Sequence, residues 1–330
     1  MNSTNSVNET WNDPWGPYWD AMTVITIQSG WVTLPVSFVQ LFLLIYIVWR
    51  EYLGANAAVS CTNASTAGAP TTGAETSASR RLCFLPLNLL IFALIAFNCT
   101  GSFTGLIING GLPASDICNI CDNATPYFVL SDLCIACYQF LTVYYTWIRN
   151  FPVAETTARW SLPYLRALVV LYGLLQVSQF SLWLPQVQMS FALDSAAIAG
   201  VTTASDVVVF LFDAAILVSF VAYLRRSRKS GEGLSSVQDR MAVVARFGVA
   251  SFVVYQIYLC SYIVFSAIFA PVEPGVSVGV FSVVYGVQQY VPLVYIFLQL
   301  GMKWLVHVAR ERGRSVMTGD STNRGFGSGK

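Results

Sequence analysis

Basic residues are sorted along this chain in a way that constrains its fold more than any other feature. No Lys or Arg precedes the first apolar segment, and the 18 basic residues then gather beside alternate ends of the apolar segments. The groups are Arg50 with Arg80 and Arg81, Arg149 to Arg166, Arg225 to Arg246, and Lys303 to the chain end. Short loops rich in Lys and Arg stay cytoplasmic because cationic side chains resist translocation across a bilayer. The pattern therefore predicts seven membrane crossings, with the N-terminus outside or lumenal and the C-terminus cytoplasmic.

The apolar segments are long enough to cross a membrane as helices. About 20 apolar residues span roughly 30 Å of hydrocarbon, and backbone groups in lipid must pair within their own segment, which requires helices. Composition agrees, because 55% of the residues are hydrophobic and only 11% are charged, whereas a soluble domain has about 25% charged residues. We predict an all-α integral membrane fold with spans at 24–49, 83–109, 126–148, 164–190, 201–224, 243–270 and 277–305.

We expect one membrane domain flanked by short tails. Residues 1–23 form an extracellular or lumenal tail, residues 24–308 the seven-helix domain, and residues 309–330 a cytoplasmic tail. The tail before the first span lacks the basic region and early apolar run of a cleavable signal peptide, so this span should act as its own signal anchor. The loop at about 51–80 is rich in Ala, Ser, Thr and Gly. Such a composition cannot bury enough apolar surface to fold, so we predict a disordered cytoplasmic loop.

Three carboxylates lie inside the predicted spans: Asp132, Asp206 and Asp213. A charge at the bilayer centre costs about 2.5–3.5 kcal/mol, so Asp213, near the middle of its span, needs a partner, a water or a proton. Asp206 and Asp213 are two turns apart and share one helix face, which we expect to point into the bundle.

No basic residue lies deep in a predicted span, so the partners of these acids should be amides and hydroxyls of other helices. The candidates include Gln139, Gln256, Gln288 and Gln289. One interpretation is that these groups only hold the helices together by hydrogen bonds. The other is that they line a polar cavity that binds a ligand or moves a proton.

Basic residues after the third and fifth spans form the candidate surface for a cytosolic partner. These residues are Arg149, Arg159, Arg166, Arg225, Arg226 and Arg228. The alternative for the cluster that ends the fifth span is a topology anchor beside anionic lipid.

Cysteines and sequons indicate modifications on the outer side. Cys118 and Cys121, together with Cys134 and Cys137, have the spacing of a four-cysteine zinc site. The second pair lies inside an apolar helix, so we favour a disulfide between Cys118 and Cys121 in an oxidising compartment. Asn2, Asn8 and Asn123 begin sequons in predicted outer segments, where glycosylation is expected.

The residue inventory excludes several enzyme and cofactor classes. His307 is the only histidine, too few for a zinc-dependent seven-span hydrolase and misplaced for a serine-type intramembrane protease. A retinal protein needs a lysine in the middle of its last span, and the chain has none there. Phosphate loops and dinucleotide fingerprints are also missing from the sequence. We expect no enzymatic activity, no cofactor, no metal and no nucleic-acid partner.

Seven spans in this orientation resemble a G-protein-coupled receptor. Of the motifs of the rhodopsin-like class, only Pro292-Leu293-Val294-Tyr295 remains in the last span, and Arg149-Asn150 follows the third span where Asp-Arg-Tyr is expected. These departures argue against ordinary coupling to a heterotrimeric G protein.

The second half of the chain is similar to the tobamovirus-multiplication family of plant proteins and to the related lysosomal orphan-receptor-like proteins. The resemblance rests on Asp132, Arg149-Asn150-Phe151-Pro152, Arg159, Tyr223-Leu224-Arg225-Arg226 and Val284-Tyr285-Gly286-Val287-Gln288-Gln289-Tyr290-Val291-Pro292. The chain departs from that family at Gln288 and Gln289, where an acid is usual, and in its longer first loop. The resemblance implies a non-enzymatic protein of the endomembrane system that recruits a small GTPase through its cytoplasmic face.

The leading hypothesis is therefore a receptor-like or scaffold protein that engages a cytosolic small GTPase or G protein through its basic loops. The alternatives are a proton-coupled transporter that uses the intramembrane aspartates, and a structural subunit of a larger membrane complex. We expect a multi-pass protein in contact with membrane lipids, in the plasma membrane or an endomembrane such as the vacuole or lysosome.

Overall fold

The computed structural model describes residues 15–65, 74–109, 125–189, 195–229, 236–269 and 275–323, and these residues are almost entirely helical. Seven helices in this part of the chain are long and apolar enough to span a membrane, which confirms the prediction of an all-helical fold with seven helices of this kind. The helices are α1 (Gly16–Ser65), α2 (Ala74–Ile108), α4 (Thr125–Thr157), α5 (Leu162–Met189), α6 (Ser195–Lys229), α7 (Ser236–Phe269) and α8 (Val278–Asn323), with a short 3₁₀ turn, η2 (Arg159–Ser161), between α4 and α5.

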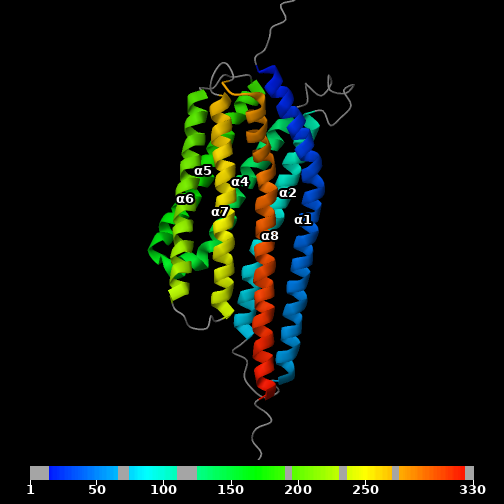
Figure 1. The fold of residues 1–330 in the computed structure, drawn as a ribbon, viewed down its shortest axis with the longest axis vertical. Coiled ribbons are helices and arrows are strands. Elements are labelled where there is room, and N and C mark those ends of the chain that lie inside the picture. Colours follow the sequence, from blue (N-terminus) through cyan, green and yellow to red (C-terminus); the bar gives the residue numbers. More distant parts are fainter. Residues whose placement is uncertain are drawn as a thin grey trace, which may run out of the picture.

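The helices form one elongated bundle in which consecutive helices run in opposite directions (Figure 1). We call the side on which α1 begins the N side and the side on which α8 ends the C side. The first and last helices lie next to each other and run parallel. Their contacts follow the same order along both helices, from Thr26–Tyr285 through Gln40–Leu293 to Glu51–Lys303. Helix α4 has the most neighbours, because it packs against α2, α5, α6 and α7.

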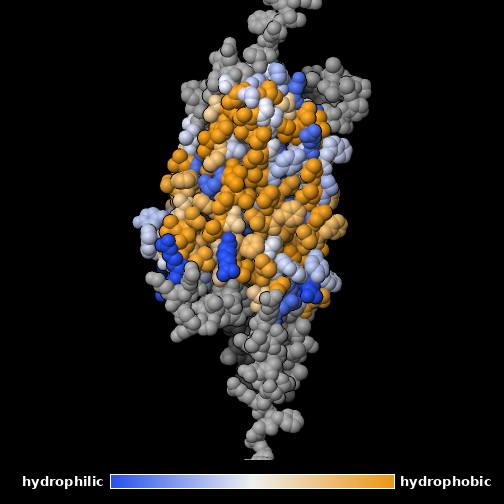
Figure 2. All heavy atoms as spheres, viewed as in Figure 1, coloured by the Kyte–Doolittle hydropathy of each residue, from blue (hydrophilic) through white to orange (hydrophobic). Residues whose placement is uncertain are grey.

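The distribution of side chains is the reverse of that in a soluble bundle. Large apolar side chains such as Phe42, Val218 and Val283 are about two-thirds exposed, and Figure 2 shows apolar residues covering most of the face between the two ends. Uncharged polar side chains, including the amides Gln40 and Gln299, are fully buried. A surface of this kind is suited to lipid, where polar contacts between helices stabilise the interior.

Glycines allow close approach of helices at three places in the bundle, one of them Gly173 of α5, where an added methyl group would lie 2.9 Å from the Phe140 ring of α4. A methyl group added to Gly248 of α7 would lie 2.1 Å from the ring of Phe220 on α6. A methyl group on Gly30 of α1 would lie 2.4 Å from Leu106 of α2. Membrane helices commonly use small residues in this way, since packing rather than a hydrophobic drive holds them together.

The helices extend further on the C side than the sequence predicts. Helix α1 continues to Ser65 and α2 begins at Ala74, so most of the loop predicted to be disordered at 51–80 is helical. Helix α8 likewise continues to Asn323, through most of the tail predicted at 309–330. Extending an existing helix costs much less than nucleating a new one, and the alanines after residue 54 have high helix propensity.

Candidate functional site

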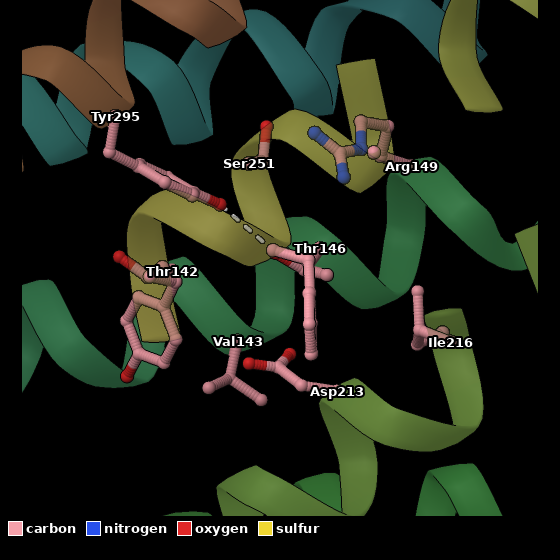
Figure 3. A pocket seen from close by; sticks show the side chains of 11 residues that line it. Thr142, Val143, Thr146, Arg149, Asp213, Ile216, Ser251 and Tyr295 are labelled. Atoms are coloured by element: carbon pink, nitrogen blue, oxygen red, sulfur yellow. Dashed lines mark hydrogen bonds between the residues drawn. The ribbon is translucent and has the colours of Figure 1, made fainter. Parts of the chain in front are cut away.

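A small cavity lies inside the bundle between α4, α6, α7 and α8. Its volume of about 20 Å³ has room for about one water molecule. In the view of Figure 3, Asp213 of α6 lies on one side of the cavity, and Tyr295 of α8 and Ser251 of α7 lie on the other. The other lining residues are Thr142, Val143, Thr146, Arg149, Ile216, Gly248, Phe252 and Tyr255. An acidic side chain, Asp213, and a cationic one, Arg149, therefore line the same water-sized space.

Arg149 forms a buried hydrogen-bond network that joins three helices. Its side chain is only 6% exposed. The guanidinium donates one N–H to Oε1 of Gln299 on α8 and another to Oδ1 of Asn150 at 3.0 Å. Gln299 in turn donates to Oγ of Ser251 on α7 at 2.9 Å. We call these four residues, Arg149, Asn150, Gln299 and Ser251, the Arg149 network.

Asp213 is buried beside this network, on the fourth helix that lines the cavity. Its side chain is 7% exposed, and Nε2 of Gln256 on α7 donates to its Oδ2 at 3.2 Å. The Arg149 guanidinium is close enough to Asp213 to attract it electrostatically. A buried carboxylate is tolerated when it has a hydrogen-bond donor and a nearby cation, and Asp213 has both.

Helical periodicity explains why Asp213 points inward. The buried positions of α6 recur every three or four residues at Val209, Phe212, Asp213, Ile216 and Phe220. Positions with this spacing form one stripe along a helix. The aspartate therefore takes its direction from the apolar residues on either side of it, which anchor the stripe in the bundle.

The same reasoning applies to Arg149 on α4. Buried side chains on this helix follow one another at Tyr138, Thr142, Tyr145 and Arg149, and the guanidinium lies 5.8 Å from the centre of the Tyr145 ring. The structure does not place Arg149 on the partner-facing surface predicted from the sequence. The predicted span ended at residue 148, but α4 continues for about two turns beyond Arg149, to Thr157. A basic residue therefore lies nearer to Asp213 than the sequence indicated, although the recorded hydrogen-bond partner of this acid is the amide Gln256, as predicted.

Tyr295 lines the cavity and forms a hydrogen bond between helices. Its hydroxyl lies 3.0 Å from the hydroxyl of Thr146 on α4, as the dashed line in Figure 3 marks. Its ring packs near that of Tyr255, with 6.3 Å between the ring centres. This contact links α8 to α4 one turn from the Arg149 network.

Replacing Tyr295 with phenylalanine should reduce the free energy of unfolding by about 0.6 kcal/mol, the average for one hydrogen bond between membrane helices. The ring remains, so the packing against Tyr255 should persist. Denaturation of the purified protein in mixed micelles would measure the change. Thr146→Val should cost a similar amount, and the double variant should cost no more than either single variant. Additive losses would show that the two hydroxyls do not interact.

The other two acids lie nearer the N side. Asp132 of α4 and Asp206 of α6 are partly buried, and both interact electrostatically with Tyr262 of α7. Tyr262 also has a hydrogen-bonding interaction with Gln179 of α5. The two acids therefore share a neighbour, and neither belongs to the lining of the cavity at Asp213.

The glutamines predicted from the sequence have separate places. Gln139 donates to the Tyr258 hydroxyl at 3.2 Å, and Gln288 donates to the carbonyl of Ser261 at 3.1 Å. Gln289 interacts with Tyr285. Of the glutamines named from the sequence, Gln256 is the one whose hydrogen bond to an intramembrane acid the structure records.

The remaining arginines of the predicted partner surface differ from Arg149. Arg159, Arg166 and Arg225 are exposed, and we call these three the exposed arginines. The Arg166 guanidinium lies 5.8 Å from the centre of the Phe151 ring. Arg226 is also exposed, and it takes part in a further interaction. Arg228 lies on α6, but its side chain is outside the described part of the structure.

The structure also contains a buried ion pair that the sequence analysis missed. Lys303 of α8 is 9% exposed, and its ammonium group lies 2.7 Å from Oε2 of Glu51 on α1. It also donates to Oδ1 of Asn88 on α2. The sequence does place Glu51 and Lys303, which have opposite charges, at the same ends of the first and last spans. The pairing itself follows only once α1 is known to pack against α8.

The predicted modification sites cannot be placed in the same way. Asn2, Asn8, Asn123, Cys118 and Cys121 all lie outside the residues that the structure describes. Cys134 and Cys137, which shared the spacing of a zinc site, are free thiols on α4. In the described ranges no three His, Cys, Asp or Glu side chains come together as a metal-binding group.

Comparison with protein-family models, with curated proteins and with solved structures found no match to this chain. The resemblances noted from short sequence motifs therefore stay predictions. The function must be argued from the cavity, the Arg149 network and the exposed arginines.

Proposed function

We propose that the chain is a non-enzymatic, receptor-like membrane protein whose C side faces the cytosol and binds a cytosolic partner. The exposed arginines Arg159, Arg166 and Arg225, with Arg226 and Arg228, provide the binding surface. A partner with an acidic surface, such as a small GTPase or a G protein, has the complementary charge. In this proposal the Arg149 network holds the C side in one arrangement and its release changes the surface.

The observation that supports this proposal is the continuity between the Arg149 network and the exposed arginines. Arg149 and Asn150 belong to the buried network, and the next residue, Phe151, packs under the guanidinium of Arg166. The exposed Arg159 follows shortly after, at the start of η2. A shift of α4 against α8 that broke the contact with Gln299 would therefore move this segment. In the proposal this segment is the element with two arrangements that a receptor mechanism requires.

The proton-coupled carrier is the weaker alternative for a physical reason. Asp213 is suited to bind a proton inside the membrane, but the Arg149 guanidinium lies beside it toward the C side. A fixed positive charge in a narrow passage repels protons and cations. The cavity of about 20 Å³ also leaves little room for a transported solute.

The proposed orientation, with the C side in the cytosol, determines which residues can be modified on the other side of the membrane. With the N side outside or lumenal, Asn2, Asn8 and Asn123 become glycosylation sites and Cys118 and Cys121 can form a disulfide. The membrane is then the plasma membrane or an endomembrane such as that of the vacuole or lysosome. A glycan at Asn63, a sequon residue on the opposite side, would contradict this orientation.

Replacing the three exposed arginines with alanine should weaken partner binding about tenfold. Each exposed ion pair contributes roughly 0.5 kcal/mol, and three together amount to about one order of magnitude in affinity. Purification in mild detergent would first identify the partner, and binding to the chain in lipid nanodiscs would then be measured. Co-purification of a multi-protein membrane complex without a GTPase would favour the structural-subunit alternative.

The matched control replaces the same three arginines with lysine. This variant keeps the positive charge, so it should retain most of the affinity and the same dependence on salt concentration. Equal amounts of folded protein in the nanodiscs would be verified by size-exclusion chromatography. Undiminished binding of the alanine variant would rule out the exposed arginines as the partner surface.

A further inference from the structure

A ladder of tyrosines connects the two acids near the N side with Asp213. Tyr262, Tyr258 and Tyr255 follow one another on α7 at intervals of three or four residues, so they share one helix face. The ring centres of Tyr255 and Tyr258 are 5.9 Å apart. The ladder and the acids of α6 have the same spacing, since Asp206 and Asp213 are also seven residues apart. Both stretches cover about 10 Å along the helix axis.

Geometry brings α7 and α6 together at the Asp213 end of the ladder, because Tyr255 and Asp213 line the same cavity and Gln256, next to Tyr255, donates to Asp213. Asp206 interacts electrostatically with Tyr262 and Tyr258, and Asp213 interacts with Tyr255. Because α6 and α7 are antiparallel, these pairings keep one constant register. Side chains of the other helices support the ladder, with Gln139 bonded to Tyr258 and Tyr172 interacting with Tyr255. Groups that can carry a proton therefore occur at every turn from Asp206 to Asp213.

The ladder ends at Asp213 on the C side. The next ionisable group beyond the carboxylate toward that side is the Arg149 guanidinium, which cannot give up its proton in a protein. The cavity between them has room for about one water molecule. A proton that reaches Asp213 from the N side is therefore stopped there, and its arrival changes the charge that Arg149 faces.

We propose that Asp213 is a binding site for a proton, which reaches it from the N side through the tyrosine ladder, and that this proton is the ligand that weakens the hold on Arg149. A bulk proton first binds a carboxylate oxygen of Asp206 or Asp132. Each tyrosine hydroxyl then accepts one proton and donates its own to the next group. The last transfer forms an O–H bond on Asp213, and no electron or heavy atom changes place.

The surroundings of Asp213 determine the effect of this proton. Arg149 on α4 is the cation that faces it, Tyr255 on α7 and Tyr295 on α8 are its titratable neighbours, and Asp206 lies two turns away on its own helix. Tyr172 of α5 contacts Tyr255 instead. Protonation removes the negative charge beside Arg149. The guanidinium then keeps its hydrogen bonds to Gln299 and Asn150 and loses the electrostatic attraction of Asp213.

Infrared difference spectroscopy of the full chain in nanodiscs tests the binding site directly. Lowering the pH should produce the C=O band of a protonated carboxylic acid. In Asp213→Asn, which resembles the protonated acid in shape and charge, one such component should be missing. The same spectrum in the variant and the unchanged chain would overturn the assignment to Asp213.

Tyr258→Phe tests the route without touching the site. It keeps the ring and removes the hydroxyl, so after a pH jump the Asp213 band should form at least tenfold more slowly and reach the same final amplitude. Asp132→Asn and Asp206→Asn would show which acid receives the proton first. An unchanged rate in all three variants would overturn the ladder as the route.

Proteoliposomes separate binding from transport and fix the side of entry. A pH change on the N side alone should produce the band, and no steady proton flux should follow. Steady flux would show that protons pass Arg149, which would overturn this inference and support a carrier.

The effect of the proton on partner binding rests on the proposed function, whereas the proton site itself does not. Partner recruitment is therefore measured separately. Loss of recruitment control with the Asp213 band intact would contradict the proposed function and leave the proton site standing.

Discussion

Replacing Arg149 with methionine should lower the free energy of unfolding of the purified protein by about 3 kcal/mol, because buried polar groups lose their hydrogen bonds. Methionine has similar length and is apolar, so the change removes the charge and the hydrogen bonds with little loss of volume. The carboxylate of Asp213 then keeps only its bond from Gln256, and the acceptors on Gln299 and Asn150 lose their donor. Buried acceptors that lose their donor cost about 1–3 kcal/mol, and the buried carboxylate also loses the attraction of a nearby cation.

Asp213→Asn in the Arg149→Met background should recover at least half of this loss. The second substitution removes the uncompensated charge and keeps the size of the side chain. Denaturation in mixed micelles, followed by tryptophan fluorescence, would measure all three variants. Arg166→Met is the control, because this arginine is exposed and its contact with the Phe151 ring contributes about 0.5–1 kcal/mol. Equal losses in Arg149→Met and Arg166→Met would mean that the buried network has no special role in stability.

Gly248→Ala should destabilise the protein by about 2 kcal/mol through overpacking. The added methyl group would lie 2.1 to 2.8 Å from three carbons of the Phe220 ring. Phe220 is only 1% exposed, so its ring cannot move away without displacing its neighbours in the core. The expected result is a separation of α6 and α7 near the cavity that contains Asp213.

Two further variants make this prediction specific. Phe220→Leu combined with Gly248→Ala should restore most of the stability, because the smaller side chain leaves space for the methyl group. Gly286→Ala on α8 is the matched control, since no atom lies within 4 Å of the added methyl group. Alanine has the higher helix propensity, so this control should be neutral or slightly stabilising. Comparable destabilisation at positions 248 and 286 would point to a general effect of glycine rather than to the contact with Phe220.

Hydropathy was sufficient to predict the seven spans, because the length of each apolar segment is fixed by the thickness of the bilayer. The cost of a charge in the bilayer and the two-turn spacing of Asp206 and Asp213 were sufficient to predict that Asp213 points into the bundle, where the structure buries it beside Phe212 and Ile216. The inventory of interior amides also contained Gln256, the hydrogen-bond donor to Asp213. These features depend on one helix at a time, which is the information that a single sequence carries.

The position of Arg149 could not be predicted in that way. An arginine next to an apolar segment normally marks the membrane boundary, and hydropathy cannot detect that the helix continues to Thr157. Lys303 was missed for a related reason, because its partners Glu51 and Asn88 come from helices far away in the sequence. Buried charges are stabilised by neighbours from other helices, so they become predictable only when the packing order is known.

The parallel pairing of α1 with α8 has a consequence for how the protein is made. Helix α1 carries a stripe of buried polar residues that includes Ser29, Thr33 and Gln40, and Gln40 and Glu51 pair with residues of α8. Lys303 follows Glu51 by 252 residues, which a ribosome adds in about 10 to 50 s. During that interval α1 remains in the insertion machinery or in lipid, and its polar residues are not yet paired with α8. A chain that is truncated before its last helix would leave Gln40 and Glu51 of α1 without their partners on α8.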